Sequence, residues 1–296
     1  MKRNHILLIG LILILGVVAY LVLQRPGESS IQSSERALLI QYDSLAIDRM
    51  EVTSQFGQVV IEKKAGEWMI SQPVSYRADR SAVMDAITKG ASMRTSGIIS
   101  SNPDKQTTYQ VDSTAPLVKM FEKGTVRASF RVGKPGSSFN ETYVRLDESD
   151  DVYLVNEMLT QVYTRQVKDW RDKAIFRSTR ESVSSVSFRY GDTTFTLSKL
   201  DTIWTVDGQP ANMNAISAFL AAITGFMSDE FIDVPPATTP SNAGTIDIDG
   251  TQILFFSGPD PAKLLVQTSV SPQWFEVQSW RASQVLKRKK VFQTSS

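Results

Sequence analysis

One stretch of the 296-residue chain decides the fold: residues 66–79, with the sequence GEWMISQPVSYRAD. It predicts a strand around Trp68 that ends at Pro73, because proline cannot donate the backbone hydrogen bond that a central strand requires. Asp79 then stands where the N-cap of a helix belongs. The apolar face of that helix repeats every fourth residue, at Val83, Ile87 and Ala91.

A second copy of this plan follows in the C-terminal half. Trp204 takes the place of Trp68, and Asn212, also a favourable helix cap, takes the place of Asp79. A second apolar helix face follows, made of Ile216, Leu220 and Ile223. We therefore interpret the chain as one supersecondary unit used twice, which indicates a duplication.

The remaining segments alternate apolar and polar residues and are separated by glycine and aspartate turns, a pattern typical of antiparallel strands. We predict an α+β fold with two tandem related units, each an antiparallel sheet with packed helices. The first unit is predicted over residues 38–176 and the second, shorter one over 177–296. They would follow a cytoplasmic stub and transmembrane helix over 1–23 and a polar linker over 24–37.

Residues Ile6 to Leu23 form an apolar run of 18 residues. As a helix the run is roughly 27 Å long, close to the roughly 30 Å of a bilayer's hydrocarbon core. A signal peptide cleaved after Val17-Val18-Ala19 is the alternative, but the apolar run continues past that point, so we expect an uncleaved anchor. Lys2 and Arg3 would keep the N-terminus cytoplasmic, which places the body in the periplasm or outside the cell.

Composition excludes several kinds of chemistry. The chain has no cysteine and a single histidine, His5, in the N-terminal stub. Disulfides, thiolate nucleophiles, cysteine-bound metals and a Ser-His-Asp triad in the folded body are thereby excluded. The formal net charge of +1 gives no basic field for nucleic acid. We predict no catalytic residue, no metal site and no cofactor.

Two motifs look like ligand loops and are better explained as turns. Residues 133–138 (GKPGSS) lack the spacing of a phosphate loop, and Pro135 removes an amide that could bind phosphate. Residues 247–250 (DIDG) begin like a calcium loop, but no bidentate acid follows at the required distance, and Asp-Gly between strands predicts a hairpin.

The segment Trp170-Arg171-Asp172 is the one candidate site for a partner. An aromatic residue among charges is typical of an interface anchor. The same residues could instead pin the crossover between the two units through ion pairs. Both interpretations remain open at this point.

Several motifs together resemble a bacterial domain-of-unknown-function family, number 4340. They occur in the order Gly66-Glu67-Trp68, Ala78-Asp79, Tyr109-Gln110-Val111-Asp112, Val152-Tyr153-Leu154-Val155 and Trp170-Arg171-Asp172-Lys173. Gln110 replaces the glycine usual in the family's Tyr-Gly-Leu-Asp element, which puts the geometry of that turn in question. The resemblance implies an extracytoplasmic protein with one N-terminal span, associated with ABC transporters of the gliding-motility auxiliary type.

We therefore expect a non-enzymatic, membrane-anchored accessory subunit of an ABC-transporter-like complex. Its partners would be the lipid bilayer, through Ile6 to Leu23, and a permease or auxiliary subunit. A binding module for an envelope polymer or a small ligand, using a groove between the two units, is the alternative. A carboxylate-based hydrolase is the third interpretation, although nothing singles out one pair among the 31 acidic residues.

Overall fold

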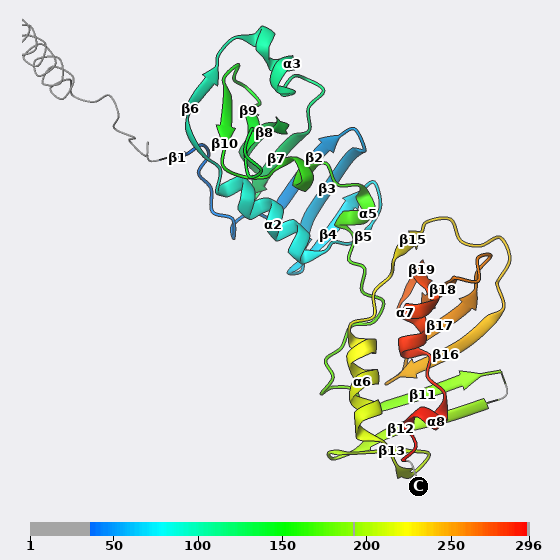
Figure 1. Cartoon of the computed structure of the whole chain (residues 1–296). Helices are drawn as coiled ribbons and strands as arrows, with labels where there is room; N and C mark the ends of the chain where they lie inside the picture. Colours follow the sequence, from blue (N-terminus) through cyan, green and yellow to red (C-terminus); the bar gives the residue numbers. More distant parts are fainter. Residues whose placement is uncertain (1–35, 192, 295–296) are drawn as a thin grey trace, which may run out of the picture. The chain divides into compact units, whose positions relative to one another are not determined.

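The computed structural model describes residues 36–191 and 193–294 (Figure 1). The predicted span Ile6 to Leu23 and nearly all of the predicted linker lie outside these ranges. Within the described ranges, no helix is both long enough and apolar enough to cross a bilayer.

The described chain forms two compact units. One contains residues 36–74 and 81–165, and the other contains residues 75–80 and 166–294. The sequence predicted the boundary between 176 and 177, whereas the structure ends the first unit at Arg165 and assigns residues 75–80 to the second. The reason is backbone pairing, since Ala78 bridges Arg171 and the Asp79 N–H donates to the Trp170 carbonyl at 2.7 Å.

The first antiparallel sheet has ten strands in the order β1-β6-β10-β9-β8-β7-β2-β3-β4-β5. Their bounds are β1 Ala37–Leu38, β2 Arg49–Ser54, β3 Gly57–Lys64, β4 Glu67–Gln72, β5 Tyr76–Arg77, β6 Arg94–Ser100, β7 Leu117–Glu122, β8 Thr125–Pro135, β9 Thr142–Leu146 and β10 Val152–Val155. The predicted strand around Trp68 is β4, and it ends one residue before Pro73. Alternate residues of β2 are buried, as expected for a sheet with one covered face.

Helix α2 (Arg80–Ala91) buries Val83, Ala86 and Ile87, which confirms the predicted helix. The chain between β6 and β7, expected to be a loop, contains the short helices η1 (Pro103–Lys105) and α3 (Gln106–Tyr109). Gln110 ends α3 in the left-handed conformation that glycine adopts most readily, with φ 56°. Gln110 therefore adopts a conformation in which glycine would also be favourable. A further short helix, α4, spans Thr160–Tyr163.

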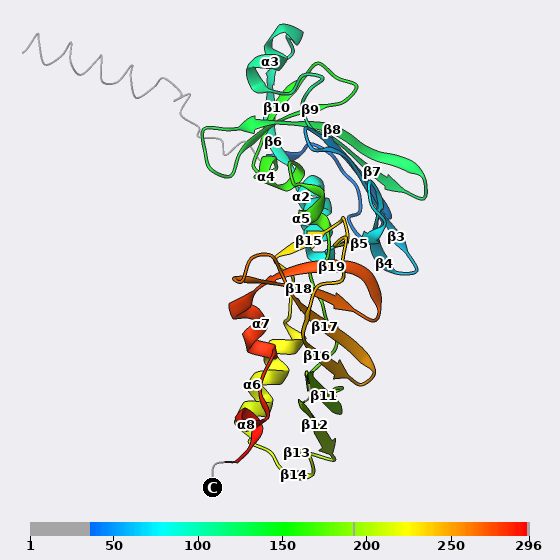
Figure 2. The same ribbon diagram turned by 90° about the vertical axis from the view of Figure 1, so that its right-hand side faces the viewer.

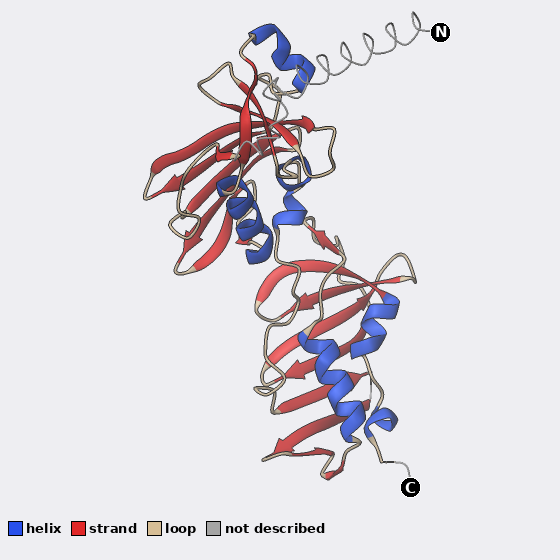
Figure 3. Ribbon diagram, turned by 60° about the vertical axis from the view of Figure 1, so that its left-hand side comes forward, coloured by secondary structure: helices blue, strands red, loops and turns tan. Residues whose placement is uncertain are grey.

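The second antiparallel sheet has nine strands in the order β14-β13-β12-β11-β16-β17-β18-β19-β15. Their bounds are β11 Ser185–Tyr190, β12 Thr193–Leu200, β13 Ile203–Val206, β14 Gln209–Pro210, β15 Glu230–Ile232, β16 Asn242–Ile248, β17 Thr251–Ser257, β18 Lys263–Thr268 and β19 Ser271–Gln278. The helices of this unit are α5 (Val167–Trp170), α6 (Met213–Thr224), α7 (Ser279–Val285) and α8 (Lys289–Phe292). Figures 2 and 3 show α6, α7 and α8 on one face of the sheet.

Aromatic side chains fill the space between this sheet and its helices. The Phe188 ring stacks on Phe195 with centroids 4.6 Å apart and contacts Phe219 of α6 at 5.3 Å. Asn212 caps α6 as predicted, because its side-chain oxygen accepts from the amides of Asn214 and Ala215.

The two sheets share one strand order. Read from β15, the second sheet matches β6-β10-β9-β8-β7-β2-β3-β4-β5 of the first strand for strand, and α6 follows β14 as α2 follows β5. The register agrees as well, since Trp68 pairs with Lys63 and Trp204 pairs with Lys199. Both tryptophans are buried. The predicted Asp249-Gly250 hairpin turn joins β16 to β17, with positive φ at both residues.

Candidate functional site

The predicted partner residues lie at the end of α5 in the second unit. Trp170 is fully buried, and Arg171 is only 4% exposed. The side chain of Asp172 accepts from the Ala174 N–H at 3.0 Å and forms an ion pair with Arg177. The structure therefore places Trp170 and Arg171 inside the unit, and neither side chain forms part of its surface.

The guanidinium of Arg171 lies between two aromatic rings. Its central carbon is 4.5 Å from the Phe231 ring centroid and 5.0 Å from that of Tyr76, and the two rings meet edge-on at 5.4 Å. Arg171 Nη1 also pairs with Asp233 Oδ1 at 2.7 Å, and Nη2 donates to Gln273 Oε1 at 3.5 Å. A planar, weakly hydrated guanidinium suits this position, because it stacks on ring faces while its edge keeps hydrogen-bond partners.

These contacts enclose the side chain of Phe231 on β15, the last strand of the second sheet. Phe231 belongs to β15, Tyr76 to β5, and Arg171 directly follows α5. Gln273 is hydrogen-bonded to the last residue of β15, since its Nε2 donates to the Ile232 carbonyl at 2.9 Å. The segment thus holds the Arg171 side chain by contacts within the second unit. We call Tyr76, Arg171 and Phe231 the arginine clamp.

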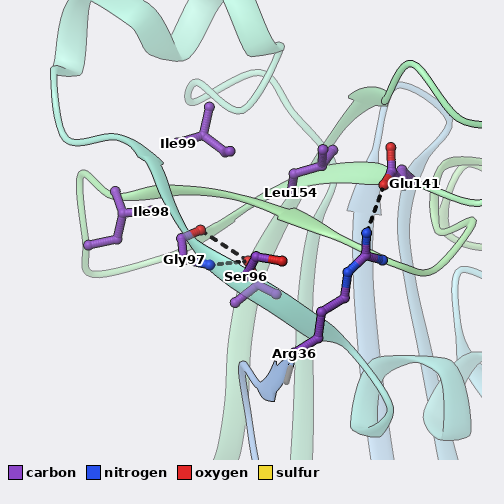
Figure 4. Close-up of a pocket in the computed structure, with 8 residues that line it drawn as sticks. Arg36, Ser96, Gly97, Ile98, Ile99, Glu141 and Leu154 are labelled. Carbon is purple, nitrogen blue, oxygen red and sulfur yellow. Dashed lines mark hydrogen bonds and ion pairs between the residues drawn. The ribbon is translucent and has the colours of Figure 1, made fainter. Parts of the chain in front are cut away.

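The first sheet has a stretch of unpaired strand at its β6 edge. One side of β6 pairs with β10 in an irregular register, whereas β1 pairs only with Arg94 and Thr95 on the other side. Among the residues that the structure describes, no strand pairs with that other side of residues 96–100. Ile98 and Ile99 are adjacent in this open stretch and are 54% and 46% exposed. Figure 4 shows both side chains pointing away from the strand.

A small hollow of about 160 Å³ lies beside this open stretch. Arg36 reaches into it and pairs with Glu141 at 3.3 Å (Figure 4). Glu141 is held by the β8–β9 loop, because its backbone carbonyl accepts from the Gly136 N–H at 2.8 Å. The 133–138 segment thus contributes to a hairpin, as predicted, and its Gly136 leaves no room for a Cβ against Glu141 and Leu154.

We call residues 96–100 with Arg36 and Glu141 the β6 edge. No sequence motif predicted a site at these residues. The sequence contained one local signal, two adjacent isoleucines among serines and a glycine. Successive side chains of a strand point to opposite faces, so both isoleucines cannot face a core that covers one side of the sheet. The openness of the edge, however, depends on strand order.

The described part of the chain contains no group of three or more His, Cys, Asp or Glu side chains placed to hold a metal ion. A family model described as "Domain of unknown function (DUF4340)" matches residues 68–245, more than half of the chain. The chain belongs to this family. The match begins at Trp68 and ends in β16, so it includes parts of both units. No curated protein and no solved structure matched the chain.

Proposed function

We propose that the protein is a non-catalytic, membrane-anchored accessory subunit that binds an ABC-transporter-like membrane complex through the β6 edge. Its N-terminus would lie in the cytoplasm and its two units outside. The observation that carries the proposal is the open stretch of β6 with exposed Ile98 and Ile99. The choice of an ABC-type partner rests on the family resemblance.

An open strand with exposed apolar side chains is a binding feature in itself. Its free N–H and C=O groups can pair with an extended segment of another protein, and side chains at alternate positions provide specificity. Natural proteins usually protect such edges with charges, prolines or covering elements. Residues 96–100 (SGIIS) carry no charge and no proline.

The position of Arg36 supports a partner at the membrane. Residues 24–35 separate Leu23 from Arg36, and 12 residues span at most about 40 Å when fully extended. If Ile6 to Leu23 crosses the bilayer, the β6 edge is held within that distance of its surface. A membrane complex would therefore meet this edge at a high effective concentration.

Affinity purification from native membranes tests the proposal. The full-length protein with Ile98→Asp and Ile99→Asp is compared with the wild type, and co-purifying ABC-type subunits are quantified by mass spectrometry. We expect the double variant to lose at least about tenfold of the transporter subunits, because a charge in an apolar interface is left unpaired. Both side chains are exposed, so stability should change by less than about 0.5 kcal/mol for each substitution.

Ile203→Asp is the matched control, since Ile203 is also an exposed isoleucine on a strand, 63% exposed on β13. It should retain the partner. If no transporter subunit co-purifies with the wild type, or if the double variant retains it fully, the proposal is wrong.

The shared strand order also supports a duplication of one ancestral unit. Both the strand-for-strand correspondence and the equivalent tryptophan register agree with it.

A further inference from the structure

We infer that a second hollow in the first unit binds a small hydroxyl-rich ligand, a single sugar unit, through a wall rich in hydrogen-bond acceptors. The hollow has a volume of about 400 Å³ and lies between the β2–β3 turn, the chain after α3, β8 and α4. Pockets of roughly 300–1,000 Å³ are typical of small-molecule sites. The inference uses none of the residues of the β6 edge and stands independently of the proposed function.

Threonine hydroxyls line one side of the hollow, and each already donates its proton to an oxygen of the protein. Thr160 Oγ1 donates to the Gly133 carbonyl at 3.0 Å, and Thr164 Oγ1 donates to the Thr160 carbonyl at 2.7 Å. On the opposite side, Thr114 Oγ1 donates to Asp112 Oδ1 at 2.6 Å. A hydroxyl has one proton and two lone pairs, so these oxygens can only accept from a ligand.

Asp112 adds the one acidic group of the lining. The Thr114 hydroxyl and amide both donate to it and lower the pKa of Asp112, so the carboxylate is charged at neutral pH. Arg131 lies close enough to lower the pKa of Asp112 as well. Its guanidinium, however, forms an ion pair with Asp147. No lysine or arginine is among the described residues that line the hollow. The wall therefore favours donor-rich ligands and disfavours anions such as phosphate esters.

Two glutamines complete the polar lining. Gln55 and Gln110 are exposed at the mouth of the hollow, and each side-chain amide can donate and accept. Pro116 supplies a partly exposed apolar surface for the C–H face of a sugar ring, beside the buried Ala115 and Val132. Gly133 allows close packing here, because a Cβ at this position would come within 2.4 Å of the Tyr109 carbonyl oxygen.

Ligand-observed saturation-transfer NMR on the full-length protein in lipid nanodiscs tests the inference. Nanodiscs avoid detergents with sugar headgroups, which would compete for the hollow. The probes are glucose, glucosamine and glucose 6-phosphate. We expect glucose and glucosamine to bind with dissociation constants near the millimolar range. Glucosamine should bind more tightly, because its ammonium group faces Asp112, and the phosphate ester should bind at least about tenfold more weakly.

Two pairs of variants locate the site. Thr164→Val should weaken binding about 3- to 10-fold through the loss of one acceptor. Thr224→Val is its control, since Thr224 Oγ1 donates to the Leu220 carbonyl four residues earlier in α6, as Thr164 Oγ1 does to Thr160 in the first unit. Gln55→Ala removes an exposed side chain of the lining without touching the core, and Gln58→Ala on the same hairpin is its control.

The inference holds if both lining variants weaken sugar binding while both controls bind as the wild type does. It is overturned if neither sugar gives saturable binding, if the controls lose as much as the lining variants, or if glucose 6-phosphate binds as tightly as glucose. Gln55→Ala keeps the test decisive even if Thr164→Val fails to fold.

Discussion

The corresponding strands of the two sheets, β6 in the first unit and β15 in the second, differ in how their apolar side chains are packed. Phe231 of β15 is covered by Arg171 and Tyr76. Ile98 and Ile99 of β6 are exposed, and their strand has an open side among the described residues. Among the described residues, neither β15 nor residues 96–100 of β6 have a strand partner on the outer side, so the difference lies in side-chain packing. An enclosed aromatic side chain adds to stability, whereas exposed apolar side chains on an open strand offer a surface to a partner.

Phe231 is enclosed by residues that lie far from it in the sequence. Residues 75–80 and 166–172 belong to the second unit and supply Tyr76 and Arg171. The segment Trp170 to Lys173 thus contributes to packing within the second unit. We therefore expect the arginine clamp to contribute to the stability of the second unit, and three groups of substitutions compare the two units.

The largest effect is expected for Arg171→Ala. The substitution removes two cation–π contacts of about 1 kcal/mol each, so the free energy of unfolding should fall by about 2 kcal/mol. Asp233 is 61% exposed, so its carboxylate is not left buried and unpaired. Chemical denaturation measures the loss, and hydrogen exchange of the β15 and β19 amides should accelerate.

Arg281→Ala is the matched control for the arginine clamp. Arg281 lies over one ring, the exposed Trp280, and pairs with Asp229 at 3.0 Å. Its loss should cost about 1 kcal/mol or less and leave exchange at β15 unchanged. Equal effects of the two substitutions would show that the clamp adds no more to stability than a single exposed cation–π pair.

The second prediction compares the helices that cover the two sheets. Gly90→Ala in α2 places a Cβ 2.4 Å from the Tyr42 hydroxyl and 2.9 Å from that of Tyr163. Both hydroxyls are tied to the helix backbone, at the carbonyls of Ile87 and Ala86. Overpacking should therefore outweigh the roughly 1 kcal/mol gain in helix propensity and destabilise the protein by about 1–2 kcal/mol.

Gly225→Ala, at the end of α6, provides the comparison for Gly90→Ala. Its Cβ would meet no atom closer than 3.4 Å, the Ala221 carbonyl oxygen. We expect no loss of stability in thermal unfolding. A stabilised Gly90→Ala protein would mean that the two tyrosines can move away from α2.

The smallest effects concern the caps of the two helices. Asn212→Ala should cost about 1 kcal/mol, because the amides of Asn214 and Ala215 lose their acceptor, whereas Asn212→Asp should be nearly silent. Asp79, which directly precedes α2, should behave in the same way with Ala and Asn. Denaturation midpoints measure all four variants. Loss of partner binding in a folded Asp79→Asn protein would point instead to a need for the charge.

Much of the local structure could be predicted from the sequence. Alternation around Trp68 and Trp204, the Asp249-Gly250 turn and the Asn212 cap were identified correctly, because each depends on neighbours within a few residues. Short helical turns after Asn102 were missed, since polar residues form such turns through their own side chains. Asn102 accepts from the Asp104 amide and so caps η1.

The sequence by itself determined two antiparallel sheets, their tryptophan positions and the exclusion of cysteine and histidine chemistry from the folded body. Only the tertiary structure decided that Arg171 is enclosed by Tyr76 and Phe231 and that Ile98 and Ile99 are exposed. The physical reason is distance along the chain. Backbone periodicity records which face of a strand is apolar, but the covering of an edge depends on residues that lie far apart in sequence and meet only after folding.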